Sequence, residues 1–309
     1  MPTHPRRSAS PVGAGTSFPK PLKPRFTGTN SEYGVLRQVL LASPQHLSIV
    51  PCNRVSEDAL QEGRSSCTAS AKGQHRALVD QLSAAGVRVV TVKPVPNLPD
   101  LAFTRDSSLM TPWGLIGLRP GASHRRREVD FVLEAARAAT LPVLGRVEVG
   151  CIEGGDVCLL RPGHVVVGIS GQRTDVDGAK ALGRFFEQRD WVVTYTPVDP
   201  DLLHLDTHFC MLDRKLALGC IEKLDAAFLG QLAQLGIEVI PVELGEVSTL
   251  GCNVLSLGRK RIISSGSAPR VDEAVRQRGF EVYTVSLNEF TQCGGGVHCL
   301  TMPLERTSS

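Results

Sequence analysis

A five-fold repeat of short apolar segments is the feature that most constrains the fold of this chain. The segments are rich in β-branched residues, and their starts are 43 to 54 residues apart, a spacing typical of repeated structural units. Each segment follows a stretch with apolar residues at helical spacing, and a glycine ends this stretch at positions 86, 236 and 279. The five segments span residues 87–92, 141–147, 191–197, 237–242 and 280–285.

A pair of short strands is expected between one apolar segment and the next helix. The clearest hairpin joins residues 156–160 to residues 164–169 across a Pro-Gly turn. The repeating unit is therefore strand, strand, helix, strand. No unit can bury its apolar face alone, so we predict that about five of them pack into a single α/β domain. The same pairing is expected for 210–212 with 216–220, and for 253–257 with 261–264.

Composition narrows the class of protein. Hydrophobic residues make up 42 % of the chain and charged residues 21 %, as in ordinary globular domains. The formal net charge of +3 and the scattered basic residues argue against nucleic acid as a partner, and no apolar run is long enough to cross a membrane. Nine irregularly spaced cysteines, without a Cys-x-x-Cys pair or a signal peptide, favour reduced thiols and a cytoplasmic location. We expect disordered tails at 1–25 and 306–309 around one catalytic domain at 26–305.

Five chemically suggestive residues recur at one phase of the repeat, at intervals of 47, 51, 48 and 47 positions. If the units surround a common axis, these positions converge on one central pocket. The spacing thus predicts that motifs far apart in the sequence form a single site. The five residues are Asp106, Glu153, His204, Cys252 and Cys299.

Cys299 follows three consecutive glycines, which permit close approach of the backbone to a ligand. Taken alone, this segment is as consistent with a turn before a buried cysteine as with a nucleophilic cysteine. A nucleophilic cysteine needs access to its substrate and a nearby positive charge. His204 and Asp206 are expected to share one face of an extended segment, a pairing suited to acid/base chemistry, although a lone histidine there is more often structural. A zinc site that combines His208 with Cys293 and Cys299 is disfavoured, because no second close pair of cysteines is present.

Two acidic patches complete the set, and each would pass for a simple turn in isolation. Glu153 and Asp156 flank a glycine pair, and Phe103, Arg105 and Asp106 form the second patch. At one repeat phase, however, a thiol, an imidazole and several carboxylates suit a cationic substrate with an electrophilic carbon. A guanidinium group meets that description.

At these motifs the chain resembles the guanidine-modifying superfamily, and dimethylarginine dimethylaminohydrolases most closely. The resemblance extends from about residue 33 to residue 304 and implies a five-bladed ββαβ α/β-propeller, the pentein fold. The stretches that carry it are Arg119-Pro120-Gly121-Ala122, Arg125-Arg126, Glu128-Val129-Asp130, Gly168-Ile169-Ser170 and Arg173-Thr174.

The resemblance implies a role for each site residue. Cys299 would be the nucleophile, His204 the general acid/base, and Glu153 the residue that orients His204. Asp106 would bind the guanidinium N–H groups. No metal or organic cofactor is implied. The expected partner is a small guanidine substrate, and a homodimer is the assembly that the resemblance allows. Further substrate-binding residues would be Phe103, Arg105, Asp156 and Asp206, with Arg125 and Arg173 on the substrate's α-carboxylate.

Three departures from the dimethylargininase pattern bear on the substrate. Asp206 stands where those enzymes typically have lysine and resembles the deiminases and amidinotransferases, while Arg105 and the glycines at 294–296 resemble the deiminases. We therefore expect a cysteine-dependent hydrolase that cleaves a C–N bond of arginine or Nω-methylated arginine, giving citrulline plus ammonia or an amine. An amidinotransferase and a non-catalytic binding protein of the same fold are the alternatives.

Overall fold

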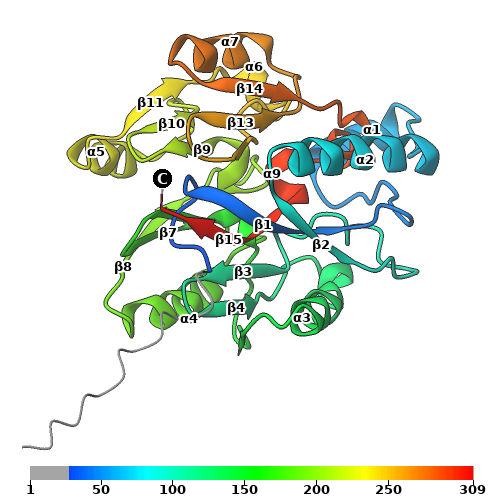
Figure 1. Ribbon diagram of the computed structural model, residues 1–309, viewed down its shortest axis with the longest axis horizontal. Helices are drawn as coiled ribbons and strands as arrows, with labels where there is room; N and C mark the ends of the chain where they lie inside the picture. Colours follow the sequence, from blue (N-terminus) through cyan, green and yellow to red (C-terminus); the bar gives the residue numbers. More distant parts are fainter. Residues whose placement is uncertain (1–27, 309) are drawn as a thin grey trace, which may run out of the picture.

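The computed structural model describes residues 28–308, so the tail expected at 1–25 lies outside the described residues. The described strands form five three-stranded sheets (Figure 1). The sheets are β15 (Met302–Thr307), β1 (Val35–Ala42) and β2 (Arg88–Val92); β3 (Ser108–Thr111), β4 (Gly114–Gly117) and β5 (Val143–Arg146); β6 (Val157–Arg161), β7 (His164–Ile169) and β8 (Val192–Pro197); β9 (Phe209–Asp213), β10 (Leu216–Gly219) and β11 (Glu238–Pro241); β12 (Leu255–Ser256), β13 (Arg261–Ser264) and β14 (Glu281–Thr284).

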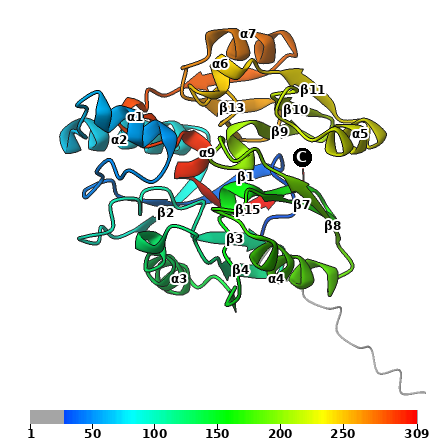
Figure 2. The same ribbon diagram turned by 180° about the vertical axis from the view of Figure 1, so that it is seen from behind.

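Every sheet has the same connectivity. Its middle strand pairs antiparallel with one neighbour and parallel with the other, and a helix joins the two parallel strands. These five helices lie on the periphery in both views (Figures 1 and 2). The ββαβ unit and the five-bladed pentein arrangement predicted for the chain are thereby confirmed. The connecting helices are α2 (Thr68–Ala84), α3 (Glu128–Ala138), α4 (Val176–Glu187), α5 (Ala226–Gln234) and α7 (Pro269–Gln277).

The helix α4 shows why each unit folds as it does. Asp175 caps its N-terminus by accepting a hydrogen bond from the Gly178 N–H group (2.7 Å). Its inward face buries Leu182 and Phe186 completely against the neighbouring strands. Burial of two such side chains contributes about 3–6 kcal/mol, which anchors the helix on its sheet.

The two ends of the chain close the ring. Strand β15 pairs antiparallel with β1, and the register sets Val35 opposite Thr307 and Leu40 opposite Met302. Both views show the two strands side by side (Figures 1 and 2). The last strand extends past the domain limit expected at residue 305, because buried Arg306 donates hydrogen bonds to backbone carbonyls at Gly34 (2.6 Å) and Ser256 (2.8 Å).

The loops that precede the first strand of each sheet meet at the centre of the ring. A hydrogen bond joins each of these loops to the next, so the five loops form a closed circle. The shorter helices lie in or near these connections: α1 (Arg54–Gln61), α6 (Leu244–Val247), α8 (Asn288–Thr291), α9 (Val297–Leu300), and the 3₁₀ turns η1 (Ser123–Arg125), η2 (Gly154–Asp156) and η3 (Leu205–Thr207). The five bonds run from Gly154 N to Asp106 O (3.3 Å), Leu205 N to Asp156 Oδ1 (2.9 Å), Asn253 Nδ2 to Asp206 O (3.3 Å), His298 N to Asn253 Oδ1 (3.0 Å) and Arg105 N to Cys299 O (3.2 Å).

Within residues 28–308, none of the helices has the length and apolar character that a membrane crossing requires.

Candidate active site

Cys299 lies in the short helix α9, three residues before β15, and its side chain is buried. Its thiol receives a hydrogen bond from Asn253 Nδ2 (3.2 Å) and lies 3.6 Å from Asp206 Oδ2. Burial raises the pKa of the Cys299 thiol, and the charges of Asp206 and Asp106 raise it further. The thiol therefore needs a cationic neighbour before it can ionise.

His204 lies in the loop before β9, where its Nε2 donates to Glu153 Oε2 at 2.7 Å. Burial opposes protonation of His204, but the Asp106 charge and the Glu153 hydrogen bond outweigh it and raise the pKa of the imidazole to about 9. The other ring nitrogen, Nδ1, is buried without a hydrogen-bond partner and lies 3.8 Å from Asp106 Oδ1. His204 is thus an imidazolium with one N–H free to serve a ligand.

The glycine pair before β6 allows this imidazole to pack against the backbone. A Cβ atom at Gly155 would come within 2.6 Å of the His204 ring, so any larger residue would displace it. The Gly155 N–H group also donates to Asp106 Oδ1 (3.1 Å). The glycine pair between Glu153 and Asp156 therefore has a packing reason.

Glu153 is completely buried and receives hydrogen bonds from three directions. Burial opposes its ionisation, but the hydrogen bond from His204 and the charge of Arg173 hold the pKa of its carboxyl group below the ordinary value. Arg173 Nη1 donates at 3.2 Å, and the backbone N–H of Gly121 donates at 3.0 Å. This carboxylate stays charged and holds the imidazole of His204 in place.

Arg125 lines the pocket and supports Asp106. Its Nη1 donates to Asp106 Oδ2 (2.6 Å), and its Nε and Nη2 donate to Glu128 Oε2 (3.1 and 3.0 Å). Nη2 also reaches the carbonyl oxygens of Phe103 (2.9 Å) and Asp100 (3.3 Å). Every nitrogen of the buried guanidinium bonds to protein oxygen, and the role of Arg125 on a substrate carboxylate stays a prediction.

Two other residues expected to bind substrate lie away from the pocket. Arg105 is directed toward Glu32, with Nη1 at 3.4 Å from Oε1, and its Nε donates to the His298 carbonyl (3.4 Å). Asp156 accepts a hydrogen bond from the backbone of Leu205 and links two loops of the ring. Binding of substrate by Arg105 and Asp156 stays a prediction, since the contacts of both buried side chains in this structure are with protein groups.

Asp206 does not share a face with His204 as expected, because residues 205–207 form the turn η3 rather than an extended strand. Its Oδ2 accepts from His298 Nδ1 (2.8 Å), whereas Oδ1 is buried without a hydrogen-bond partner. Burial opposes ionisation of Asp206, but the hydrogen bond and charge of His298 lower its pKa. The Oδ2 atom of this carboxylate lies 3.6 Å from the Cys299 thiol.

The fourth unit contributes Asn253, which the sequence argument missed. Cys252, the residue at the expected phase, lies in a hydrophobic cluster with Val254 and Ile262 and has no exposed surface. Asn253 instead donates to the Cys299 thiol and accepts from the Cys299 N–H group (3.4 Å). In the sequence, the only indication of this role was that polar Asn253 directly follows Cys252, the position that the repeat interval gives.

Replacing Asn253 with alanine should slow both turnover and alkylation of Cys299 by about tenfold to a hundredfold. The reason is the loss of a hydrogen bond to a charged sulfur, which contributes about 1.5–3 kcal/mol. The measurements are kcat and the rate of iodoacetamide labelling followed by mass spectrometry. Cys252→Ala is the matched control, since it alters the core next to Asn253 but no contact with the thiol. A labelling rate of Cys299 in Asn253→Ala equal to that of the wild type would show that Asn253 does not affect the reactivity of the thiol.

One pocket brings the predicted residues together. Asp106, His204 and Cys299 line it with Phe103 and Arg173. Glu153 lies directly behind His204, and Asp206 lies beside the thiol. The geometry thus places a thiol, an imidazolium and two carboxylates around one point.

Comparisons with known proteins identify the family of the chain. The family described as "N,N dimethylarginine dimethylhydrolase, eukaryotic" matches residues 49–306. Protein YkgA of Bacillus subtilis, which is uncharacterised, is 30 % identical over 91 % of this chain and 96 % of its own length. The N(G),N(G)-dimethylarginine dimethylaminohydrolase of Streptomyces coelicolor is 30 % identical over 75 % of this chain and 84 % of its own length.

Among solved structures, the N-terminal domain of ArgZ, a cyanobacterial arginine dihydrolase, superimposes with a TM-score of 0.76 at 23 % identity. The match covers 87 % of this chain and 98 % of that domain. This likeness shows the fold. Together with the family match, it shows that the chain belongs to the dimethylarginine dimethylaminohydrolase family of the guanidine-modifying superfamily and is a hydrolase of amidine C–N bonds.

Proposed function

We propose that the chain hydrolyses the guanidinium group of arginine or Nω-monomethylarginine through a covalent intermediate on Cys299. The observation that carries this proposal is the position of the Cys299 thiol among the carboxylates of Asp106 and Asp206, whose charges both disfavour the thiolate until a cation binds. A guanidinium supplies that cation together with an electrophilic carbon. The thiol proton leaves to solvent as this cation binds, because His204 is already protonated, so substrate binding itself activates the nucleophile.

The reaction follows from the two ring nitrogens of His204. Nε2 is held by Glu153, and Nδ1, which has no hydrogen-bond partner, can deliver its proton to the departing nitrogen as the thiolate attacks the central carbon. The leaving amine carries that proton away, and neutral His204 then removes a proton from the water that hydrolyses the thioether-bound intermediate. Citrulline is the product, and the Cys299 thiolate is regenerated.

Arg173 is the residue that we assign to the substrate's α-carboxylate. It lines the pocket, and its side chain keeps a relative exposure of 10 %. Its hydrogen bonds to Glu153 and to the Cys52 carbonyl come from Nη1 and Nη2, so the Nε–H group and the second Nη2–H group remain for a ligand. Planar guanidinium groups suit two-point binding of a carboxylate.

Asp206 sets the preference for the methylation state. Its Oδ2 lies 3.6 Å from the thiol, its Oδ1 is buried without a hydrogen-bond partner, and a guanidinium N–H would satisfy Oδ1. Two methyl groups on that nitrogen would remove the donor and leave the carboxylate oxygen unpaired, at a cost of about 1–3 kcal/mol. The relatives that act on dimethylarginine are family members, but this oxygen favours N–H donors.

We therefore expect kcat/KM for arginine or monomethylarginine to exceed that for asymmetric dimethylarginine by roughly tenfold to a hundredfold. Asp206→Ala should narrow the difference by harming the unmethylated substrate most. A substrate panel read by mass spectrometry measures both proteins and identifies the amine released. A wild-type preference for asymmetric dimethylarginine would place Asp206 away from the reacting nitrogen and leave the hydrolase intact as a dimethylargininase. Transfer of the amidino group to an added amine, in place of citrulline, would instead show an amidinotransferase.

A further inference from the structure

A buried imidazole that the proposed reaction does not use lies next to the nucleophile in the chain. His298 precedes Cys299 in α9, and its side chain is 5 % exposed. Its Nδ1 donates to Asp206 Oδ2 at 2.8 Å, and the same carboxylate oxygen lies 3.6 Å from the Cys299 thiol. Asp206 is therefore in contact with the thiol and with an imidazole from the same short helix.

Asp206 and His298 border a second, smaller cavity, which has no lining residue in common with the active-site pocket among residues 28–308. Glu32 lines this cavity too, with its Oε2 3.5 Å from His298 Nε2, and it pairs with Arg105 at 3.4 Å. Burial opposes ionisation of Glu32, but the charge of Arg105 holds its pKa below the ordinary value. His298 thus has a carboxylate at each ring nitrogen, and an arginine already neutralises the one at Nε2.

The backbone is held on both sides of His298. Asn253 Oδ1 accepts from the His298 N–H group (3.0 Å), and Arg105 Nε donates to the His298 carbonyl oxygen (3.4 Å). Because the main chain is fixed, the Nδ1–H group presents a donor to Asp206 at a defined position. A supporting hydrogen bond of this kind is what holds a site residue in its productive geometry.

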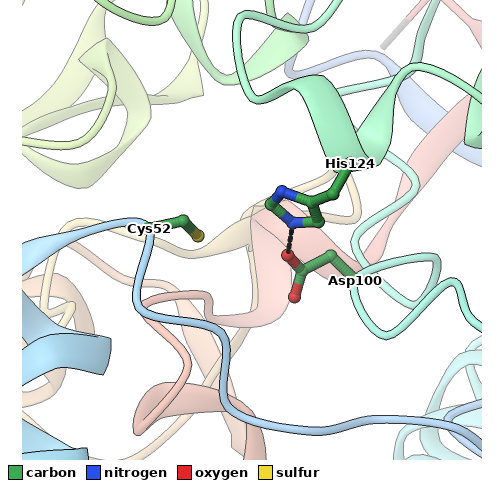
Figure 3. A group of neighbouring side chains, drawn as sticks. All are labelled: Cys52, Asp100 and His124. Atoms are coloured by element: carbon green, nitrogen blue, oxygen red, sulfur yellow. Dashed lines mark hydrogen bonds and ion pairs between the residues drawn. The ribbon is translucent and has the colours of Figure 1, made fainter.

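Another histidine–aspartate pair shows what distinguishes this one. His124 Nε2 is 2.7 Å from Asp100 Oδ2, close to Cys52 at the active-site pocket (Figure 3). The His124 side chain is 32 % exposed, so water can replace its contact with the carboxylate. The contact between His298 and Asp206 is almost completely buried, and removal of one partner from such a pair leaves a charge without compensation.

The charge of Asp206 depends on this contact. Burial opposes ionisation of its carboxyl group, and the hydrogen bond and the charge of His298 contribute most to its low pKa. Without the Nδ1 donor, the pKa of Asp206 should rise. The other titratable groups that interact electrostatically with Asp206 are the cations Arg105 and His204, the imidazole of His208 and the buried thiols of Cys158, Cys210, Cys252 and Cys299.

We propose that His298 is the positioning residue for Asp206: its Nδ1–H group fixes the orientation of the carboxylate and keeps the negative charge beside the Cys299 thiol. That charge is one of the two that keep the thiol protonated until a cation binds. His298 acts on the reaction through Asp206 and does not contact the reacting atoms. Its effect on Asp206 requires no particular substrate, whereas its effect on turnover rests on the proposed function.

Alkylation of Cys299 by two reagents of different charge tests the proposal in the free protein. The reagents are neutral iodoacetamide and cationic 2-bromoethylamine, and the ratio of their rates cancels differences in thiol ionisation. In the wild type, the ratio should stay constant between about pH 5 and pH 8, because Asp206 remains ionised. In His298→Gln, whose amide extends toward Glu32 instead of Asp206, the ratio should fall at least about fivefold toward pH 5, as one nearby charge is lost. Peptide mass spectrometry measures both rates at Cys299.

His298→Asn is the matched control, since its shorter amide places an N–H group near the position of Nδ1, and it should keep the wild-type ratio. Cys210→Ala enlarges the same cavity without changing the contact of His298 and should also keep it. Asp206→Asn should give a low ratio at every pH, and the addition of His298→Gln should change nothing further. A constant ratio in His298→Gln, or an equal fall in His298→Asn, overturns the proposal. Circular dichroism checks the fold, and His298→Ala replaces His298→Gln if glutamine disrupts it.

Turnover separates this role from the proposed function. His298→Gln should lower kcat/KM for arginine more at about pH 6 than at about pH 8, because Asp206 is protonated in the more acidic solution. An equal loss at both pH values would mean that His298 only packs against its neighbours, contrary to the proposal. Absence of citrulline with every protein, together with the expected labelling ratios, would refute the proposed hydrolysis and support the role of His298.

Discussion

Replacing Cys299 with serine is expected to lower kcat by a factor on the order of 10³ or more while the protein stays folded. Serine keeps the size and the hydrogen bond from Asn253, but its hydroxyl does not ionise in this site, where burial and two carboxylates already oppose an anion even on sulfur. The loss should fall on the first chemical step, because no covalent intermediate can form. Steady-state kinetics and mass spectrometry of the protein mixed with substrate measure both effects.

Cys293→Ser is the matched control, since Cys293 lines the same pocket. Its thiol contacts the carbonyl of Glu289 (3.5 Å), and burial raises its pKa to about 12, so it is held as a neutral thiol. The expected loss is therefore small. A covalent adduct found on Cys293, or more than about a tenth of wild-type kcat in Cys299→Ser, would contradict the assignment of the nucleophile.

His204→Ala is expected to reduce kcat by about 10²–10⁴-fold, the range for loss of a general acid/base. Both proton transfers depend on the same imidazole, so formation and hydrolysis of the intermediate should slow together. The protonated form persists up to about pH 9 in the free protein because Asp106 and Glu153 offset the effect of burial. Single-turnover kinetics, with the intermediate trapped in acid, separate the two steps.

His208→Ala provides the comparison, because it removes a neighbouring buried imidazole that has no part in the proposed chemistry. Burial lowers the pKa of His208 to about 4, and its Nδ1 lies 3.0 Å from the His204 carbonyl. It is neutral at physiological pH and contacts the turn, not the pocket. Equal losses in the two variants would mean that His204 acts only by holding the loop.

The repeat spacing alone predicted that distant residues share one pocket, and Asp106, His204 and Cys299 do line one. Asp106, Glu153, His204 and Cys299 each precede the first strand of a unit, and equivalent loops of five similar units must meet where the units surround an axis. That argument needs no knowledge of side-chain packing. It depends only on the interval between repeated units, which can be read directly from the sequence.

Orientation within the loops could not be obtained in this way. Asp206 lies on a 3₁₀ turn rather than a strand, and the fourth unit presents Asn253 where the interval predicts Cys252. A shift of one residue in a turn decides which side chain faces the axis. Periodicity is too coarse to resolve such a shift, because loop residues follow neither the helical nor the strand repeat.

The partners of buried charges were also decided by the tertiary structure. Arg105 pairs with Glu32, and Arg125 pairs with Asp106 and Glu128. In the same way, the sheet of β1 and β2 is completed by β15 from the C-terminal end of the chain. The sequence determined the unit, its number and the reactive residues at its centre, because these follow from local pattern and spacing. Which charges turn toward the substrate and which are neutralised inside the protein depends on distances between units, and only the assembled ring fixes those distances.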